Sequence, residues 1–227
     1  MPELPDITLY IEQLIPRILH QPLLKLTIKS PFVLRTVDPP ISEAEGKRII
    51  GIRRLGKRIV FALEGELFLV IHLMIAGRFR WRAPGTKPPG KLGLAAFEFP
   101  AGVLLLTEAG TKRRASIHLL AGEAQLADFD RGGLEVLETD VTSFARRLTS
   151  ENHTLKRALT DPRLFSGIGN AYSDEILHRA RLSPLTLTSR LTEAEIEQLY
   201  QATRNTLREW MTRLSEEAGE AFPEKVT

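Results

Sequence analysis

The stretch IIGIRRLGKRIVFAL (residues 49–63) decides the fold of the first half of this chain. Two apolar, β-branched runs flank its basic centre, RRLGKRI (residues 53–59), in which Gly56 suits a tight turn and Lys57 follows it. Apolar runs joined by a short Gly-containing loop are typical of a β-hairpin. The stretch therefore predicts two antiparallel strands with Lys57 projecting at the tip. A solvated turn without a ligand is the alternative interpretation.

Similar short runs lie on both sides of this hairpin, between about Leu23 and Leu120. They are rich in β-branched and aromatic residues and are separated by Gly, Pro and charged turns: LLKLTI (23–28), ELFLVIHLMIAGRFRW (66–81), LAAFEF (94–99), VLLLTEA (103–109) and ASIHLL (115–120). Regularly spaced short strands indicate an antiparallel sandwich or barrel. Between the first run and the hairpin, ISEAEG (41–46) places Ser42 and Glu45 at capping-box spacing, which predicts one short helix.

Helical periodicity appears at both ends of the chain. Residues 7–19 place seven apolar side chains at helical spacing, with Asp6 where an N-cap residue would stand. Beyond Gly132–Gly133 four helices are predicted, over 141–149, 153–160, 170–181 and 192–217, the last opened by a capping box of Thr192 and Glu195. The predicted fold class is α+β. Residues 1–131 form an antiparallel β-sandwich with flanking helices, and residues 132–227 form an all-α domain.

The composition is that of a globular protein with unevenly distributed charge. Of the 227 residues 43% are hydrophobic and none is cysteine, which excludes disulfides and thiolate metal sites and favours an intracellular setting. The net charge of +3 divides into 19 Lys/Arg against 13 Asp/Glu in residues 1–131 (+6) and 12 against 15 in residues 132–227 (−3). This basic excess in the first half suggests an anionic partner such as nucleic acid, although solvated basic loops are common.

The N-terminal stretch PELPD (residues 2–6) holds the first candidate for chemistry. Removal of Met1 would make Pro2 an N-terminal secondary amine in front of a helix. An α-amine has a pKa of about 7.7–8.0, so a neutral fraction exists at pH 7, and such amines form iminium ions with electrophilic carbons. Glu3, directly beside it, could protonate a leaving or ring oxygen. The alternative is that Pro2 and Pro5 only stiffen the start of a helix whose dipole Glu3 complements.

A second candidate is the glycine-rich turn in SGIGNAYSDEIL (residues 166–177). Gly167 and Gly169 permit backbone conformations closed to other residues, and a helix is predicted to begin at about Asn170. Several N–H groups could then converge on one phosphate oxygen. The turn is therefore interpreted as a phosphate clamp, with an ordinary glycine-rich start of a helix as the alternative.

Together these segments resemble the formamidopyrimidine-DNA glycosylase/endonuclease VIII family of base-excision repair enzymes over nearly the whole chain. PELPD is similar to the N-terminal catalytic signature of the family, RRLGKR (53–58) to the hairpin bearing its phosphate-contacting lysine, and IHLMIAGRF (71–79) to its His-Leu-x-Met-x-Gly-Arg segment. LKRALTDPRLFSGIGNAYSDEIL (155–177) is similar to the helix–two-turn–helix segment. The motifs occur in the family's order.

The resemblance implies a bifunctional DNA glycosylase and abasic-site lyase that excises oxidised bases. Pro2 would attack C1′ of the damaged nucleoside, Glu3 would protonate the opening deoxyribose, and the iminium intermediate would undergo β- and δ-elimination. Lys57 would hold the phosphate next to the lesion and Asn170 would bind the DNA backbone, while Lys156 matches a lysine near the flipped base or its phosphate. A catalytically inactive DNA-damage or DNA-structure binding protein on the same scaffold is the alternative.

The chain departs from the family where residues fill the gap left by the flipped base. The family commonly has Gly-Met where this chain has Met74 and Ile75, so the intercalating residue is either Ile75 or a displaced Met74. TEAGTKRRAS (107–116) replaces a loop that supplies two further intercalators in one branch. The preferred lesion and opposite base therefore stay open, and Arg113 and Arg114 are candidates for phosphate contact.

The sequence also lacks the four-cysteine zinc finger with which many family members end. We expect no metal or other cofactor in this chain and a finger lost by truncation, with a branch that has none as the alternative. His72 is predicted to be a hydrogen-bonded core histidine and not a ligand. We further expect damaged or abasic double-stranded DNA as the partner, no membrane association, a monomer, and a cytoplasmic location, at the nucleoid if the protein is bacterial.

Overall fold

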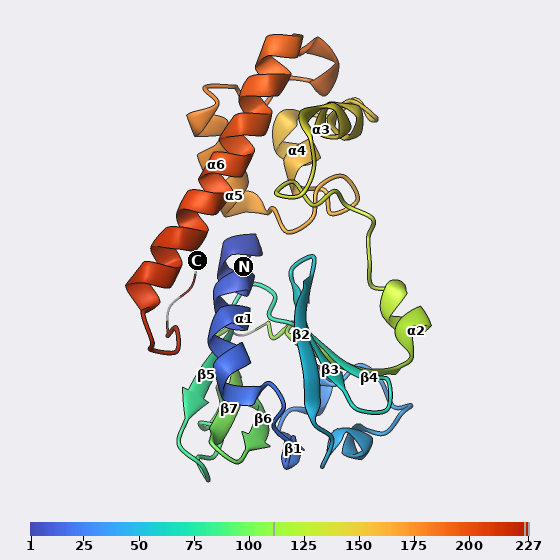
Figure 1. The fold of residues 1–227 in the computed structure, drawn as a ribbon, viewed down its shortest axis with the longest axis vertical. Coiled ribbons are helices and arrows are strands. Elements are labelled where there is room, and N and C mark those ends of the chain that lie inside the picture. Colours follow the sequence, from blue (N-terminus) through green and yellow to red (C-terminus); the bar gives the residue numbers. More distant parts are fainter. Residues whose placement is uncertain (111, 225, 227) are drawn as a thin grey trace. The chain divides into compact units, whose positions relative to one another are not determined.

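The computed structural model describes residues 1–110, 112–224 and 226, which form two compact units. The sandwich unit comprises Met1–Pro2, Asp6–Phe129 and Ala218–Thr227, and the helical unit comprises Glu3–Pro5 and Asp130–Glu217. The predicted α+β fold is confirmed, with sheets confined to the first unit and helices making up the second (Figure 1). None of the helices in the described part of the chain is long and apolar enough to span a membrane.

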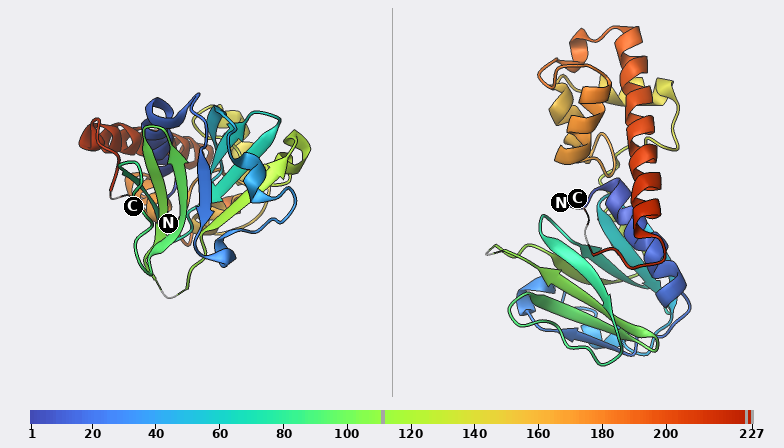
Figure 2. Two further views of the ribbon diagram at one scale, coloured as in Figure 1. Left: turned by 90° about the horizontal axis from the view of Figure 1, so that it is seen from below. Right: turned by 90° about the vertical axis from the view of Figure 1, so that its left-hand side faces the viewer.

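The sandwich unit consists of two antiparallel sheets, which can be followed in both views of Figure 2. In the described residues each sheet has four strands, in the orders β1-β6-β7-β5 and β2-β3-β4-β8. The strands are β1 (Lys25–Ile28), β2 (Ile49–Leu55), β3 (Arg58–Leu63), β4 (Leu67–His72), β5 (Gly77–Arg82), β6 (Gly93–Phe99), β7 (Gly102–Glu108) and β8 (Ser116–Ala121). Its helical segments are α1 (Leu4–Ile18), α2 (Glu123–Ala127) and two 3-10 turns, η1 (Pro31–Val33) and η2 (Ile41–Ala44).

The hairpin predicted over residues 49–63 is β2 and β3, joined by Gly56 and Lys57 alone. Leu55 pairs with Arg58 across the turn, and Gly56 has a φ of 60°. A positive φ at the first of two loop residues matches the right-handed twist of the flanking strands. This turn therefore places Lys57 at the tip, as predicted.

The core of this unit lies between the two sheets and against one face of α1. Four side chains spaced along α1 are fully buried in it: Ile7, Tyr10, Leu14 and Ile18. The Tyr10 ring meets Phe79 of β5 edge-on, with 5.6 Å between the ring centroids. Edge-to-face packing adds about 1 kcal/mol to the free energy gained by burying such rings. The amphipathic helix is thus held by the sheet it covers.

Two predicted caps are wrong. The helix α1 begins at Leu4, so Asp6 is a buried residue of its first turn and not its N-cap. Tertiary contacts of Glu3 and Leu4 set this start, as described below. In the segment predicted as a short helix, the 3-10 turn η2 has no side-chain cap, because the Glu45 carboxylate accepts the N–H of Leu26 in β1 at 2.9 Å.

The helical unit contains α3 (Val141–Leu148), α4 (Leu155–Thr160), α5 (Asn170–Arg179), the 3-10 turn η3 (Thr188–Arg190) and most of α6 (Glu193–Ala218). Its core includes Phe144, Phe165 and Tyr200, whose rings lie within 5.5 Å of a neighbour. The capping box of α6 is confirmed. The Thr192 N–H donates to the Glu195 carboxylate at 2.8 Å, and the Glu195 N–H donates to the Thr192 hydroxyl at 3.2 Å.

The residues after α6 pack within the sandwich unit. Phe222 lies against the ring of Tyr10, with 5.8 Å between centroids. Glu224 accepts hydrogen bonds from Arg80 and Arg82 of β5, each at 2.6 Å, and the bond from Arg82 lowers the pKa of its carboxyl. Segment 218–224 is therefore anchored to α1 and β5.

Candidate functional site

Glu3 is held at the N-terminus of α5. Its side chain is buried, and its carboxylate accepts the N–H groups of Gly169, Ala171 and Tyr172 at 2.6, 3.0 and 3.3 Å. The neighbouring Leu4 N–H donates to the Gly167 carbonyl at 2.9 Å. The unpaired N–H groups and the positive dipole at the start of a helix favour an anion there. Glu3 and Leu4, which directly follow Pro2, are thus fixed by four hydrogen bonds to the glycine-rich turn and the start of α5. Glu3 makes three of these bonds and Leu4 makes one.

This arrangement corrects one interpretation of the sequence. The turn does bind an anion, but the anion is the chain's own Glu3 carboxylate. The N–H groups of Gly169, Ala171 and Tyr172 are therefore not available to a phosphate, and the predicted phosphate clamp is wrong for them. A nucleic-acid contact at this turn therefore has to use other groups, such as exposed side chains.

Two predicted residues supply such side chains. Asn170 is the exposed first residue of α5. Lys156 in α4 donates to the Asn170 carbonyl at 2.8 Å and forms an ion pair with Asp174 at 2.5 Å. The structure therefore brings Lys156 to the start of α5, beside Asn170 and next to the segment that holds Glu3.

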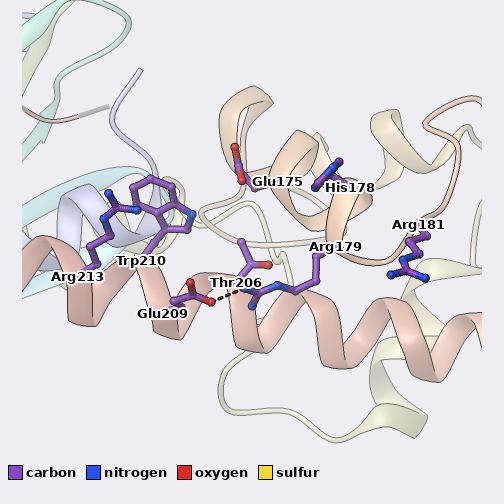
Figure 3. Close-up of a pocket in the computed structure, with 8 residues that line it drawn as sticks. All are labelled: Glu175, His178, Arg179, Arg181, Thr206, Glu209, Trp210 and Arg213. Carbon is purple, nitrogen blue, oxygen red and sulfur yellow. Dashed lines mark hydrogen bonds and ion pairs between the residues drawn. The ribbon is translucent and has the colours of Figure 1, made fainter.

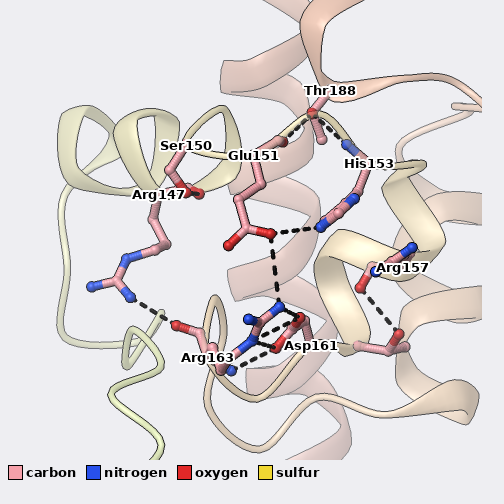
Figure 4. Close-up of polar contacts among 9 residues, drawn as sticks. Arg147, Ser150, Glu151, His153, Arg157, Asp161, Arg163 and Thr188 are labelled. Carbon is pink, nitrogen blue, oxygen red and sulfur yellow. Dashed lines mark hydrogen bonds and ion pairs between the residues drawn. The ribbon is translucent and has the colours of Figure 1, made fainter.

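A polar network supports the segment that leads into this turn (Figure 4). Arg163 forms an ion pair with Asp161 at 2.7 Å, which lowers the pKa of that carboxyl, and approaches Glu151 at 3.7 Å. The Arg163 carbonyl accepts a hydrogen bond from Arg147 at 2.7 Å, and Glu151 bonds His153 at 2.7 Å. These contacts are local to α3, α4 and their loops, so they position the turn without reaching it.

In the sandwich unit, strand register gathers other predicted residues at one end. Arg58, directly after Lys57, pairs with His72 at the end of β4, and His72 pairs with Ser116 at the start of β8. In the other sheet, with the order β1-β6-β7-β5, Gly77 at the start of β5 pairs with Glu108 at the end of β7. The hairpin tip, the β4–β5 turn and the β7–β8 connection therefore leave the sandwich at the same end, which we call the hairpin end.

Ile75 is the exposed apolar residue of the β4–β5 turn. Its side chain is 60% exposed, whereas Met74 is half-buried with a φ of 55°. The turn is closed by the Gly77 N–H, which donates to the Leu73 carbonyl at 2.9 Å. A Cβ on Gly77 would lie 2.1 Å from that oxygen, so only glycine fits there.

Arg113 and Arg114 stand in the β7–β8 connection, and both side chains are exposed. A buried carboxylate shapes this connection. Glu108 accepts the N–H of Arg114 at 3.0 Å with each oxygen and the N–H of Ala115 at 3.1 Å. The sequence around Glu108 carries no signal for this role, because nothing in it distinguishes an acceptor of backbone N–H groups from an exposed carboxylate.

The electrostatics of the hairpin end are positive. Burial lowers the pKa of His72 to about 4, and the charges of Arg58 and Lys57 and the nearby His118 act in the same direction. His72 is thus a half-buried, neutral imidazole at pH 7 that stands at the end of β4, at the edge of the core and not within it. Burial is the main cause of the lowered pKa, and the positive charges of Arg58 and Lys57 add to it.

A separate pocket of about 380 Å³ lies between α5 and α6 (Figure 3). It is lined by Glu175, His178, Arg179, Arg181, Thr206, Glu209, Trp210 and Arg213, and Arg179 pairs with Glu209 inside it. None of the predicted site residues lines this pocket.

Metal ligands are not grouped in the described part of the chain. No cluster of three or more His, Asp or Glu side chains there could hold an ion, and the sequence has no cysteine. The described residues therefore do not provide the ligands of a zinc finger.

Two family models match the chain. The one described as the formamidopyrimidine-DNA glycosylase N-terminal domain matches residues 1–114, and the formamidopyrimidine-DNA glycosylase H2TH domain matches residues 133–217. The formamidopyrimidine-DNA glycosylase of Mycoplasma genitalium is 32% identical over 87% of this chain and 70% of its own length. That of Thermus thermophilus is 35% identical over 92% of this chain and 75% of its own length.

Solved structures are similar over the same range. A complex between Lactococcus lactis Fpg and DNA containing an abasic site matches with a TM-score of 0.84 at 26% identity, covering 92% of this chain and 79% of that one. A structure of MutM with DNA containing carbocyclic 8-oxo-G matches with a TM-score of 0.84 at 25% identity, covering 93% and 80%.

Proposed function

Because the chain belongs to the formamidopyrimidine-DNA glycosylase family, we propose that it removes oxidised bases from duplex DNA and then cuts the strand at the abasic site. The observation that carries this proposal is the anchoring of Glu3, which fixes the residue next to Pro2 through three backbone hydrogen bonds. Such anchoring gives a chain terminus the fixed position that a nucleophile requires.

Pro2 is the proposed nucleophile once Met1 has been removed. Its secondary amine attacks C1′, and the base leaves with the electron pair of the glycosidic bond and takes up a proton. The Glu3 carboxylate takes up the proton that the amine loses and passes it to O4′ as the sugar ring opens, which leaves a Pro2 iminium ion. Loss of a C2′ proton to solvent then expels the 3′ phosphate, loss of the C4′ proton to solvent expels the 5′ phosphate, and water hydrolyses the remaining iminium bond to free Pro2.

Side chains from each unit are proposed to contact the DNA. At the hairpin end, Lys57 holds a phosphate, with Arg113 and Arg114 as further phosphate contacts. In the helical unit, Asn170 and Lys156 contact the backbone near the start of α5. These residues carry positive charge or a neutral amide and are suited to phosphates, which position DNA without reading its sequence.

Ile75 is proposed to fill the gap left by the flipped nucleotide. Its exposed side chain stands on a turn that Gly77 closes, whereas Met74 is half-buried in the same turn. An apolar wedge of this kind partly offsets the cost of unstacking, which is a few kcal/mol. As a bacterial-type repair enzyme, the protein is further proposed to work as a monomer at the nucleoid.

Borohydride trapping tests the proposal. A chain shown by mass spectrometry to begin at Pro2 is incubated with duplex DNA containing an abasic site or 8-oxoguanine, and a covalent protein–DNA adduct is expected. The adduct should vanish in a Pro2→Gly chain with an acetylated terminus and fall sharply in Glu3→Gln. Glu43→Gln, which changes an exposed carboxylate of η2, is the matched control and should trap normally.

The alternative is a catalytically inactive protein that binds DNA damage or DNA structure. Binding without an adduct, from a chain that begins at Pro2 and is folded by circular dichroism, would establish that alternative and overturn the lyase proposal.

A further inference from the structure

Phe32 of η1 is an aromatic residue that the fold leaves exposed to solvent. It is 80% exposed, and every other Phe, Tyr and Trp in the described residues is buried or half-buried. Leaving a large apolar ring in water forgoes the free energy that its burial would contribute. An isolated exposed ring of this kind is common at surfaces that bind an aromatic or apolar partner.

The backbone around Phe32 is well fixed. Its neighbour Val33 in η1 is buried, and Val33 donates its N–H to the Ser30 carbonyl at 3.1 Å. After η1, the chain joins β8 through a parallel bridge between Leu34 and Ile117 and through the Arg35 N–H, which donates to the Ile117 carbonyl at 2.9 Å. The ring is therefore presented by a segment tied down on both sides.

Strand register also places Phe32 at the hairpin end. It follows β1, whose last residue Ile28 pairs with Ala95 near the start of β6. Gly93 of β6 pairs with Thr107 near the end of β7, beside the pair that closes the β4–β5 turn. Phe32 thus leaves the sandwich at the same end as Lys57 and Ile75.

A hollow of about 540 Å³ lies beside the ring. It is lined by Ser30, Phe32, Gly110 and Arg113. Arg35, Lys112 and Arg114, all exposed, are neighbours in sequence of its lining residues. The hollow thus combines one aromatic ring, one guanidinium group and an excess of positive charge nearby. Proteins that bind unpaired nucleobases use such rings for stacking on the base and such charges for its phosphates.

We propose that Phe32, with Arg113, stacks on the base that loses its partner when the damaged nucleotide leaves the duplex. The inference rests on the proposed function, because it assumes DNA at the hairpin end. The β7–β8 connection from Ala109 to Ala115 contains no aromatic residue. Among the residues that line the hollow with Arg113, Phe32 supplies the aromatic ring.

The test compares two duplexes. One carries a tetrahydrofuran abasic analogue opposite 2-aminopurine, and the other is fully paired. For Phe32→Ala we expect affinity for the first duplex to fall on the order of tenfold and affinity for the second to change less than about twofold. The bound 2-aminopurine should also fluoresce more strongly with the variant, because the probe is no longer quenched by stacking. Phe32→Tyr and Phe32→Trp should restore affinity and quenching, whereas Phe32→Leu should not.

Val37→Ala is the matched control, since Val37 is 90% exposed but lies further along the chain, beyond the bridge to β8. Equal affinity of Phe32→Ala and the unchanged protein, or an equal loss on both duplexes, would overturn the inference. Borohydride trapping by the unchanged chain, measured in parallel, separates the two proposals. Trapping with no effect of Phe32→Ala removes only the stacking role. An effect of Phe32→Ala without trapping removes only the lyase.

Discussion

The hairpin end and the glycine-rich turn before α5 are both suited to an anion, but the first uses cationic side chains and the second uses backbone N–H groups. At the hairpin end, connections from both sheets bring cationic side chains to one place, and their charge adds to burial in lowering the pKa of His72 to about 4. At the turn, backbone N–H groups form the anion site, and Glu3 of the same chain fills it.

The difference teaches how one sequence feature can serve two purposes. A glycine-rich start of a helix is suited to any anion, and only the tertiary structure decides which anion reaches it. Here the three N–H groups hold Glu3 near the N-terminus, which leaves an external anion to other groups, such as the exposed side chain of Asn170. The two loop residues of the hairpin, Gly56 and Lys57, include no carboxylate, so the tip itself carries positive charge.

The largest expected effect is on the Glu3 site. Glu3→Ala removes the acceptor of three N–H groups, two of them in the buried residues Gly169 and Tyr172, and we expect a loss of about 4 kcal/mol in the free energy of unfolding. Glu3→Gln keeps one acceptor oxygen and should lose about half as much. Urea unfolding followed by circular dichroism measures both, and a loss below about 1 kcal/mol for Glu3→Ala would show that the turn does not depend on this carboxylate.

Gly77→Ala should come next, with a loss of about 3 kcal/mol. The added Cβ would lie 2.1 Å from the Leu73 carbonyl oxygen and would force the β4–β5 turn apart. Gly90→Ala is the control, because a Cβ on Gly90 meets nothing within 4 Å. The two variants are compared by their urea midpoints, and equal midpoints would mean that the turn holding Ile75 can relax at little cost.

His72 should make the stability of the sandwich unit depend on pH. Its folded pKa of about 4 lies below the unfolded value of 6.5, so the unfolded chain takes up a proton at His72 more readily than the folded one. The folded state therefore keeps its full free energy of unfolding above pH 6.5 and loses part of it as the pH falls toward 4. The shift corresponds to at most about 3 kcal/mol. His72→Gln should therefore show a smaller difference in unfolding free energy between pH 7 and pH 4. An undiminished difference in the variant would assign the pH dependence to other groups.

The smallest effects compare the two DNA contacts directly. Lys57→Ala and Asn170→Ala should each weaken duplex binding by about 1 kcal/mol, with no dependence on sequence. Only Lys57→Ala removes a charge. Only that variant should therefore make the plot of log binding constant against log salt concentration less steep, by about 0.9. Titrations at several salt concentrations measure this, and a slope change in Asn170→Ala would contradict a neutral contact at the turn.

Local patterns in the sequence determined the elements of this protein. The alternation around Gly56 and Lys57 predicts the hairpin, and the Thr192–Glu195 capping box predicts the start of α6, because every group involved lies within a few residues of its partner. Apolar spacing likewise placed the strands of the sandwich and the helices of the second unit.

The tertiary structure alone decided where the first residues of the chain are held. The partners of Glu3 lie 166 and more residues away, and no local spacing connects a carboxylate with N–H groups so distant. The same holds for the start of α1 at Leu4, for the burial of Glu108 and for the packing of Phe222 on Tyr10. Hydrophobic periodicity specifies which face of an element is buried, whereas a buried polar group takes its partner from whatever the folded chain brings within hydrogen-bond distance.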